Sequence, residues 1–374
     1  MEAASKILRK ELKSLPKRIV LKVGSLGVTG ETGVDKARLA SLSNDIIWLL
    51  KNKVEVILVS SGAIQVGRAH LRETKSEDIN TLQAMSAIGQ PLLMAAYQGI
   101  FQKKGVSTSQ VLLTHEDLGN RKRNLNLRNT LLRLLEFGVL PIVNENDSVS
   151  TAEISVGDND QLAAMVAEAT MADLLVLLTG PDGLYTCDPE KEGAKKLTAI
   201  DPEDLLEQIN TKGRSGAGRG GMKTKLDAVR RVTPLGIPVV ISSYKAKNPI
   251  RNALSGGGSY FGVPKDTKKT GKKRWLVSSA KQGAKIKVDK GAYLALKKGA
   301  SLLPSGIKSL EGLFRRGDLV TIYHQNKIIG HGLSEYSIKE LTKIKGKKSS
   351  EIEAILGHYP SKVVIHRNHL ALKE

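Results

Sequence analysis

Residues 18–24 read RIVLKVG, a short apolar run that contains one lysine and ends at a glycine. Runs this short, rich in β-branched residues or leucine, are typical of strands buried on both faces of a sheet. Five further runs have the same character: VEVILVS (54–60), QVLLT (110–114), VLPIVN (139–144), DLLVLLT (173–179) and IPVVIS (237–242). The sequence therefore predicts six buried strands before residue 243.

Longer segments lie between these runs, and their apolar residues repeat with the ~3.6-residue period of a helix. Gly138 and Gly236 follow two of these segments and favour a left-handed helix end. Strands that alternate with helices predict an α/β fold, a three-layer αβα sandwich with a mainly parallel sheet. The predicted helices cover 35–51, 82–101, 125–137, 159–171 and 223–235.

The pattern changes after residue 254. A Gly-rich run at 255–259 is followed by the lysine-rich VPKDTKKTGKK at 263–273, which has no periodic apolar face and is typical of a linker. Beyond it, strand-like pieces at 285–288, 318–323 and 362–366 and a helix at 292–298 predict a small, mostly β domain. We expect an N-terminal extension (1–17), a larger domain (18–262), a linker (263–273) and a second domain (274–374).

Composition excludes several classes of protein. Of the 374 residues, 40% are hydrophobic, too many for a largely disordered chain. No apolar run approaches the ~18 residues of a membrane-spanning helix. The single cysteine, Cys187, cannot form an intramolecular disulfide, and the N-terminal residues lack the apolar stretch of a secretory signal. We therefore expect a cytoplasmic protein.

The positive charge is unevenly distributed. The chain carries 58 basic and 37 acidic residues, or +21, and the part from Val263 onward holds 24 basic against 9 acidic residues, or +15. Such a tail either faces a polyanion or is kept soluble by lysine. An RNA-binding protein that acts through this basic C-terminal domain is therefore one alternative, although the tail offers few aromatic side chains for base stacking.

Polar residues follow the predicted strands, where a parallel sheet places its ligands. Lys22 stands near the end of the first run, with Gly24 two residues later, so we favour an anion ligand over a lysine that snorkels at a sheet edge. Taken alone, Asp147 and Asp160 would be ordinary turn or cap residues, and Asp158 is best interpreted as a helix cap.

The Gly-rich stretch GRSGAGRGGMKTK (213–225) contains the G-x-G-x-x-G pattern, but a polar turn precedes it and no βαβ unit begins there. It is therefore not a dinucleotide fingerprint, and the chain has no P-loop motif. The stretch is either a positive loop that closes over phosphates or an ordinary solvated loop. The chain also lacks H-E-x-x-H and G-x-S-x-G, which argues against a zinc protease and a serine hydrolase.

Six short motifs follow one another along the chain: KVGS (22–25), VSSGA (59–63), NEND (144–147), GDND (157–160), GLYT (183–186) and GGMKTK (220–225). Each motif alone is short, and the specificity comes from all six in one order. Together they resemble the signatures of the glutamate 5-kinases in the amino acid kinase family. The resemblance covers residues 19–262, and the remainder, including ASLLPSGIK (300–308) and RGD (316–318), resembles the PUA domain attached to many bacterial members.

This resemblance implies ATP-dependent phosphorylation of the L-glutamate γ-carboxylate to glutamyl 5-phosphate, the first step of proline biosynthesis. It also implies Mg²⁺ carried by ATP, feedback inhibition by proline and a homo-oligomer, either a dimer or a tetramer. A kinase of the same family that acts on aspartate, acetylglutamate, carbamate or a nucleoside monophosphate is the nearest alternative.

The resemblance further implies roles for individual residues. Lys22 and Lys225 would hold the transferring phosphoryl group, with Asp160 orienting both lysines, and Ser61, Asp147 and Asn159 would bind glutamate. The sequence departs from the family at Gly180, where Asp is common, and at Arg219 and Lys223, where Thr and Ser are frequent. Besides Lys22, the nucleotide site would be lined by Thr179, Gly180, Arg219, Gly220, Gly221, Met222, Lys223, Thr224 and Lys225.

Overall fold

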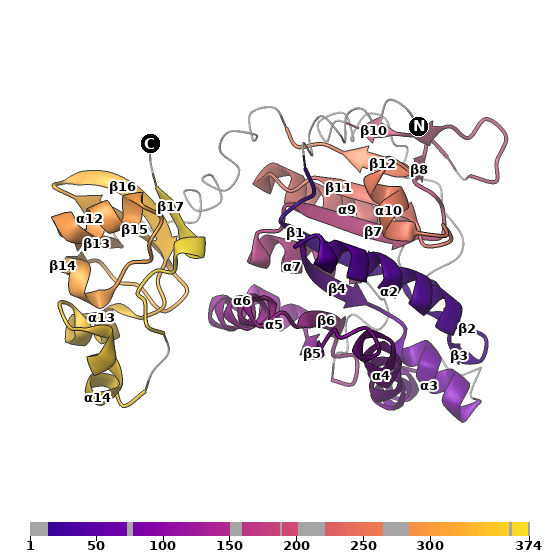
Figure 1. Cartoon of the computed structure of the whole chain (residues 1–374), viewed down its shortest axis with the longest axis horizontal. Coiled ribbons are helices and arrows are strands. Elements are labelled where there is room, and N and C mark those ends of the chain that lie inside the picture. Colours follow the sequence, from indigo (N-terminus) through magenta and orange to yellow (C-terminus); the bar gives the residue numbers. More distant parts are fainter. Residues whose placement is uncertain are drawn as a thin grey trace. The chain divides into compact units, whose positions relative to one another are not determined.

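The computed structural model describes residues 14–72, 78–149, 159–187, 189–200, 221–264, 284–358 and 361–372. The chain divides into two compact units (Figure 1). The larger contains the chain up to Asn120 and Asn126–Lys268, and the smaller contains Arg121–Leu125 and Lys269–Glu374. No helix in the described ranges combines the length and the apolar character needed to cross a membrane.

The larger unit is built on an eight-stranded sheet with the order β10-β12-β11-β7-β1-β4-β6-β5. Six strands are parallel, and β12 pairs antiparallel with β11 at one side. This confirms the predicted mainly parallel sheet. The strands are β1 (Arg18–Val23), β4 (Glu55–Ser60), β5 (Thr108–Leu113), β6 (Leu140–Glu145), β7 (Leu174–Thr179), β10 (Ala199–Ile200), β11 (Val239–Ser243) and β12 (Gly258–Phe261).

The strand order reverses at β1. The chain builds β4, β5 and β6 on one side of β1 and then crosses to β7 and β11 on the other side. In open α/β sheets the ligand lies outside the carboxyl ends of the strands at such a reversal point. Lys22, the fifth of the six residues of β1, therefore stands where a ligand is expected.

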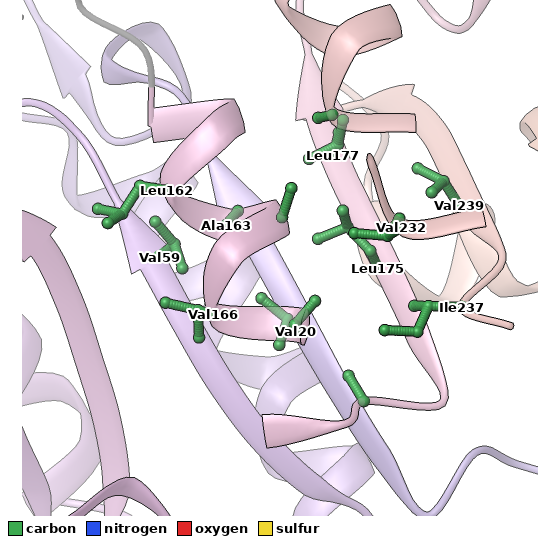
Figure 2. Packing of buried hydrophobic residues seen from close by; sticks show 14 of the residues in the cluster. Val20, Val59, Leu162, Ala163, Val166, Leu175, Leu177, Val232, Ile237 and Val239 are labelled. Carbon is green, nitrogen blue, oxygen red and sulfur yellow. The ribbon is translucent and has the colours of Figure 1, made fainter. Parts of the chain in front are cut away.

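Helices cover both faces of this sheet (Figure 1). Helices α7 and α9 pack with Val20 and Val59 on one face, and α2, α4 and α10 pack with Ile19 and Leu21 on the other. Figure 2 shows the first of these clusters. The helices of the unit are α2 (Lys36–Lys51), α3 (Ala63–Leu71), α4 (Ile79–Gln102), α5 (His115–Gly119), α6 (Arg121–Glu136, of which the part from Asn126 belongs to this unit), α7 (Asn159–Thr170), α9 (Met222–Val232) and α10 (Pro249–Leu254).

The five predicted helices are confirmed with shifts of a few residues at their ends, and α9 continues into a 3₁₀ turn, Thr233–Leu235, that Gly236 ends with a φ of +85°. Helices α3, α5 and α10 were not predicted. The Gly-rich run at 255–259 lies in the larger unit, and its last two residues begin β12. A Cβ on Gly258 would lie 2.3 Å from the carbonyl oxygen of Ile241, so the close strand pairing requires glycine there.

Two short hairpins complete the larger unit, β2 (Thr29–Gly30) with β3 (Gly33–Val34), and β8 (Leu184–Tyr185) with β9 (Lys196–Leu197). The predicted linker 263–273 lies outside the described residues from 265 onward. The predicted domain boundaries therefore stay a proposal.

The smaller unit has a five-stranded sheet with the order β14-β13-β15-β16-β17. The predicted strands near 285 and 318 and the helix near 292 are confirmed. The prediction of a strand at 362–366 is wrong. Val364 and Ile365 are apolar because they lie in the core of the smaller unit, and only Ile365 forms an isolated β-bridge, with Leu302. The elements are β13 (Lys285–Val288), α12 (Lys290–Lys297), β14 (Ile307–Glu311), β15 (Leu319–His324), β16 (Lys327–Leu333), α13 (Ile338–Ile344), α14 (Ile352–Leu356) and β17 (Leu370–Leu372).

Candidate active site

Two lysines far apart in the chain meet on one carboxylate. Lys22 Nζ lies 2.7 Å from Asp160 Oδ1, and Lys225 Nζ lies 2.9 Å from Asp160 Oδ2. The three residues are 6%, 5% and 0% exposed, in the order Lys22, Lys225, Asp160. Strand β1, helix α7 and helix α9 each supply one of them, at the carboxyl end of β1.

The alternation of side chains along β1 explains this meeting. Val20 faces the core under α7 and α9, so Lys22, two residues later, points to the same side. Asp160 lies in the first turn of α7 and Lys225 in the first turns of α9. Both helices therefore begin at this cluster, and their N-terminal ends favour negative charge there.

Among these three side chains, two ammonium groups and one carboxylate sum to +1. Burial by itself would raise the pKa of Asp160, but the two lysines outweigh it and lower that pKa, so the carboxylate stays ionised. Taking three charges out of water is costly unless they are paired with good geometry. A cluster of this kind is suited to receive an anion such as a phosphoryl group.

A chain of polar side chains begins at the residue next to Asp160. Asn159 Nδ2 donates to Ser61 Oγ at 2.6 Å and to Asn144 Oδ1 at 2.9 Å, and Asn144 Nδ2 donates to Gln90 Oε1 at 2.8 Å. Within the described part of the chain, Asn159 Oδ1 is buried and accepts no hydrogen bond. A buried acceptor of this kind is a candidate to receive a donor from a ligand.

Asp147 follows the same strand end as Asn144. Burial raises the pKa of its carboxyl to about 6, the nearby Glu145 adds to the increase, and a hydrogen bond from Ser86 Oγ at 3.1 Å opposes it. An ammonium group placed beside Asp147 would stabilise its charged form.

The predicted nucleotide residues are only partly described. Thr179 O accepts from Tyr244 N at 3.0 Å and Gly180 O from Ser243 Oγ at 2.9 Å, so β11 holds the end of β7. Thr179 stands two residues beyond Leu177, the partner of Lys22 in the sheet. Lys223 is exposed, whereas Lys225 is buried.

Some of the predicted residues lie outside the described residues, namely Arg219, Gly220 and Asp158. Two others lie at the start of α9. Gly221 caps α9, and Thr224 Oγ1 bonds to Gly221 O at 2.8 Å and to Asp160 Oδ2 at 3.2 Å. Thr224 thus joins the cluster through its hydroxyl.

The part of the chain that the structure describes contains no group of three or more His, Cys, Asp or Glu side chains able to hold a metal ion. The one carboxylate at the centre, Asp160, already faces two ammonium groups. The described side chains there do not form a cation site.

The model of the amino acid kinase family matches residues 17–243, and the model of the PUA domain matches residues 284–356. The chain belongs to the amino acid kinase family. Its kinase part contains the whole Lys22–Asp160–Lys225 cluster, and the PUA match lies in the smaller unit.

The chain is also similar in sequence, over nearly its full length, to kinases of other organisms. The chain is 42% identical to the glutamate 5-kinase of Syntrophotalea carbinolica, over 98% of this chain and 100% of that protein. It is equally identical to a glutamate 5-kinase of Thermus thermophilus, over 96% of this chain and 98% of that protein. A solved UMP kinase from Ureaplasma parvum is similar at 18% identity and a TM-score of 0.45, over 67% of this chain and all of that one.

Proposed function

We propose that this kinase transfers the γ-phosphoryl group of ATP to the γ-carboxylate of L-glutamate and so makes L-glutamyl 5-phosphate, the first step of proline biosynthesis. The observation that carries the proposal is the buried pair of ammonium groups on Asp160, next in sequence to the polar network of Asn159 and Ser61. The family membership and the names of the full-length relatives support the same reaction.

The residues suit the chemistry of a carboxylate acceptor. A γ-carboxyl group has a pKa of about 4.3 and is ionised at neutral pH. It can therefore attack phosphorus without a general base to remove a proton. The new bond joins a carboxylate oxygen to the γ-phosphorus as the bond to the bridging oxygen of ADP breaks. Lys22 and Lys225 would stabilise the charge that spreads over the moving phosphoryl group. Asp160 would hold both ammonium groups in place.

The amino-acid side of the site would recognise the other end of glutamate. The buried oxygen of Asn159, which has no partner among the described residues, and the carboxylate of Asp147 are acceptors for the α-ammonium group, and Ser61 offers a hydroxyl beside them. Binding there would charge Asp147, whose pKa the buried surroundings hold near 6 in the free protein.

The nucleotide would lie at Thr179, Gly180 and the segment 219–225. Mg²⁺ is expected to arrive with ATP, where it would neutralise part of the charge of the phosphates. Proline inhibition, a dimeric or tetrameric state and a cytoplasmic location stay predictions.

Trapping of the acyl phosphate with hydroxylamine tests the reaction. We expect hydroxamate only when glutamate and ATP are both present, and less of it when proline is added. Hydroxamate from aspartate or acetylglutamate but not from glutamate would overturn the proposal, and so would phosphorylation of a nucleoside monophosphate alone.

RNA binding by the smaller unit is a second candidate. One observation favours it: Lys343, Lys345, Lys347 and Lys348 are all exposed around the turn at Gly346. Binding through such lysines should fall steeply with salt, and no RNA binding at low salt would dismiss it.

A further inference from the structure

Helix α4 carries three buried polar side chains, Ser86, Gln90 and Tyr97, which are 3%, 7% and 0% exposed. Their spacing of four and seven residues places them on one face of the helix. The rest of that face is apolar and includes Leu82 and Leu93. Polar groups on such a face are costly unless each has a hydrogen-bond partner.

Each of the three side chains bonds to a residue at a strand end. Ser86 Oγ donates to Asp147 at 3.1 Å, Gln90 Oε1 accepts from Asn144 at 2.8 Å, and Tyr97 Oη bonds Ser60 Oγ at 2.8 Å. The helix therefore contacts Asp147 and Asn144 on the amino-acid side of the proposed site, and Ser60, which directly precedes Ser61.

Helix α4 packs with its backbone close to that of α3. A Cβ on Gly89 would lie 1.8 Å from the carbonyl oxygen of Ala63, and one on Gly67 would lie 2.0 Å from that of Met85. Helix α3 begins directly after Ser61 and Gly62. This close packing holds Gln90 at its position along α4 beside the strand ends.

Gln90, Asn144 and Asn159 form a chain of amide hydrogen bonds, in which each donor and acceptor is determined by the one before. Because Gln90 presents its oxygen, Asn144 turns its Nδ2 toward Gln90 and its oxygen toward Asn159. Asn159 then uses its Nδ2 for Asn144 and Ser61, with the carbonyl oxygen of Ser60 as a longer acceptor at 3.4 Å, and its own oxygen is left buried and without a partner among the described residues. With the opposite direction, Asn159 would present N–H groups to the ligand instead.

We propose that Gln90 is a positioning residue that sets the direction of this amide chain and so makes Asn159 an acceptor for the α-ammonium group of the substrate. The inference rests on the proposed function and goes further, since it assigns the selectivity for an amino acid over a plain dicarboxylate to a residue that does not touch it. Amide groups held in this way discriminate strongly, because a mismatched buried donor or acceptor is left unpaired.

The test compares three variants of the full chain. Gln90→Met keeps the size of the side chain and removes the acceptor, Gln90→Glu keeps an acceptor oxygen, and Gln98→Met is a matched control at an exposed position of the same helix. We measure KM for glutamate, KM for ATP and the inhibition constant of glutarate, a competitive ligand that lacks the α-ammonium group.

We expect Gln90→Met to raise KM for glutamate roughly tenfold or more, the effect of one lost hydrogen bond to a charged group. KM for ATP and the glutarate constant should stay within about twofold, and Gln90→Glu and Gln98→Met should resemble the wild type. If Gln90→Met does not fold, Gln90→Asn replaces it, because its shorter side chain cannot reach Asn144.

An unchanged KM for glutamate, or an equal loss of glutarate binding, would overturn the inference. A wild-type enzyme that makes no acyl phosphate from glutamate would instead overturn the proposed function, so the two failures are distinguishable.

Discussion

The two halves of the candidate site differ in the kind of contact that their side chains make. Around Asp160 the contacts are ionic, and three charged groups almost without solvent exposure sum to +1. Around Asn159 they are neutral amide and hydroxyl contacts whose donors and acceptors have fixed directions. Charge stabilises a moving phosphoryl group whatever its exact orientation, whereas directed hydrogen bonds select a ligand by its shape and polarity. In the proposed function, the neighbouring residues Asn159 and Asp160 therefore serve recognition and catalysis respectively.

Removing either lysine should give the largest effect. Lys22→Ala or Lys225→Ala should lower kcat by roughly 10² or more, since each removes a stabiliser of the transition state, while KM for glutamate should change little. Steady-state kinetics with both substrates varied would measure this. The control is Lys36→Ala, at a surface position at the start of α2.

A folded Lys22→Ala protein with wild-type kcat would contradict the catalytic role of the ionic half. A large rise in KM for glutamate without a change in kcat would contradict the assignment of catalysis to the ionic half and of recognition to the amide half.

Asp160→Ala should act on stability as well as on rate, because it leaves two buried ammonium groups without their carboxylate. Loss of one partner of a buried ion pair costs about 3–5 kcal/mol. Urea denaturation should show this decrease in the free energy of unfolding. Asp227→Ala, at a partly exposed position of α9, should cost no more than about 1 kcal/mol, and equal losses in the two variants would contradict the account.

Asp147 should make glutamate binding depend on pH. Below its pKa of about 6 the carboxyl is protonated and neutral, so it no longer attracts the α-ammonium group. The γ-carboxyl of glutamate, with a pKa near ~4.3, is still mostly charged at a pH of about 5. KM for glutamate should therefore rise as the pH falls from about 7 to about 5, and Asp147→Asn should have a high KM, about tenfold above wild type, that no longer varies in this range. The same pH dependence in that variant would exclude Asp147 as its source.

Tyr97→Phe should give the smallest effect. It removes one hydrogen bond, to Ser60, from a buried side chain, at a cost of about 1 kcal/mol in stability. Thermal unfolding should show a slightly lower Tm, with kcat unchanged. A loss of kcat comparable with that of the lysine variants would show that α4 serves more than the amide half.

The parallel sheet could be predicted well from the sequence, because its strands are continuous apolar runs. The prediction failed at Val364 and Ile365, whose apolar character reflects burial in the smaller core and not strand pairing. Lys22, Asp160 and Lys225 could be placed in one site through their motifs and their positions at element ends.

Gln90, Ser86 and Tyr97 were missed, because they lie in no motif and their partners are 37 to 61 residues away. One signal was available: three polar residues share the otherwise apolar face of one helix. Their partners depend on how α4 packs against α3 and the strand ends, and hydrophobic periodicity does not specify that arrangement.

The most direct test of the account is a crystal structure of the protein with glutamate and a non-hydrolysable ATP analogue. We predict both ammonium groups, of Lys22 and Lys225, at about 2.7–2.9 Å from oxygens of the γ-phosphoryl group, with the γ-carboxylate of glutamate facing its phosphorus. A closed complex in which either lysine points away from that group would contradict the central claim.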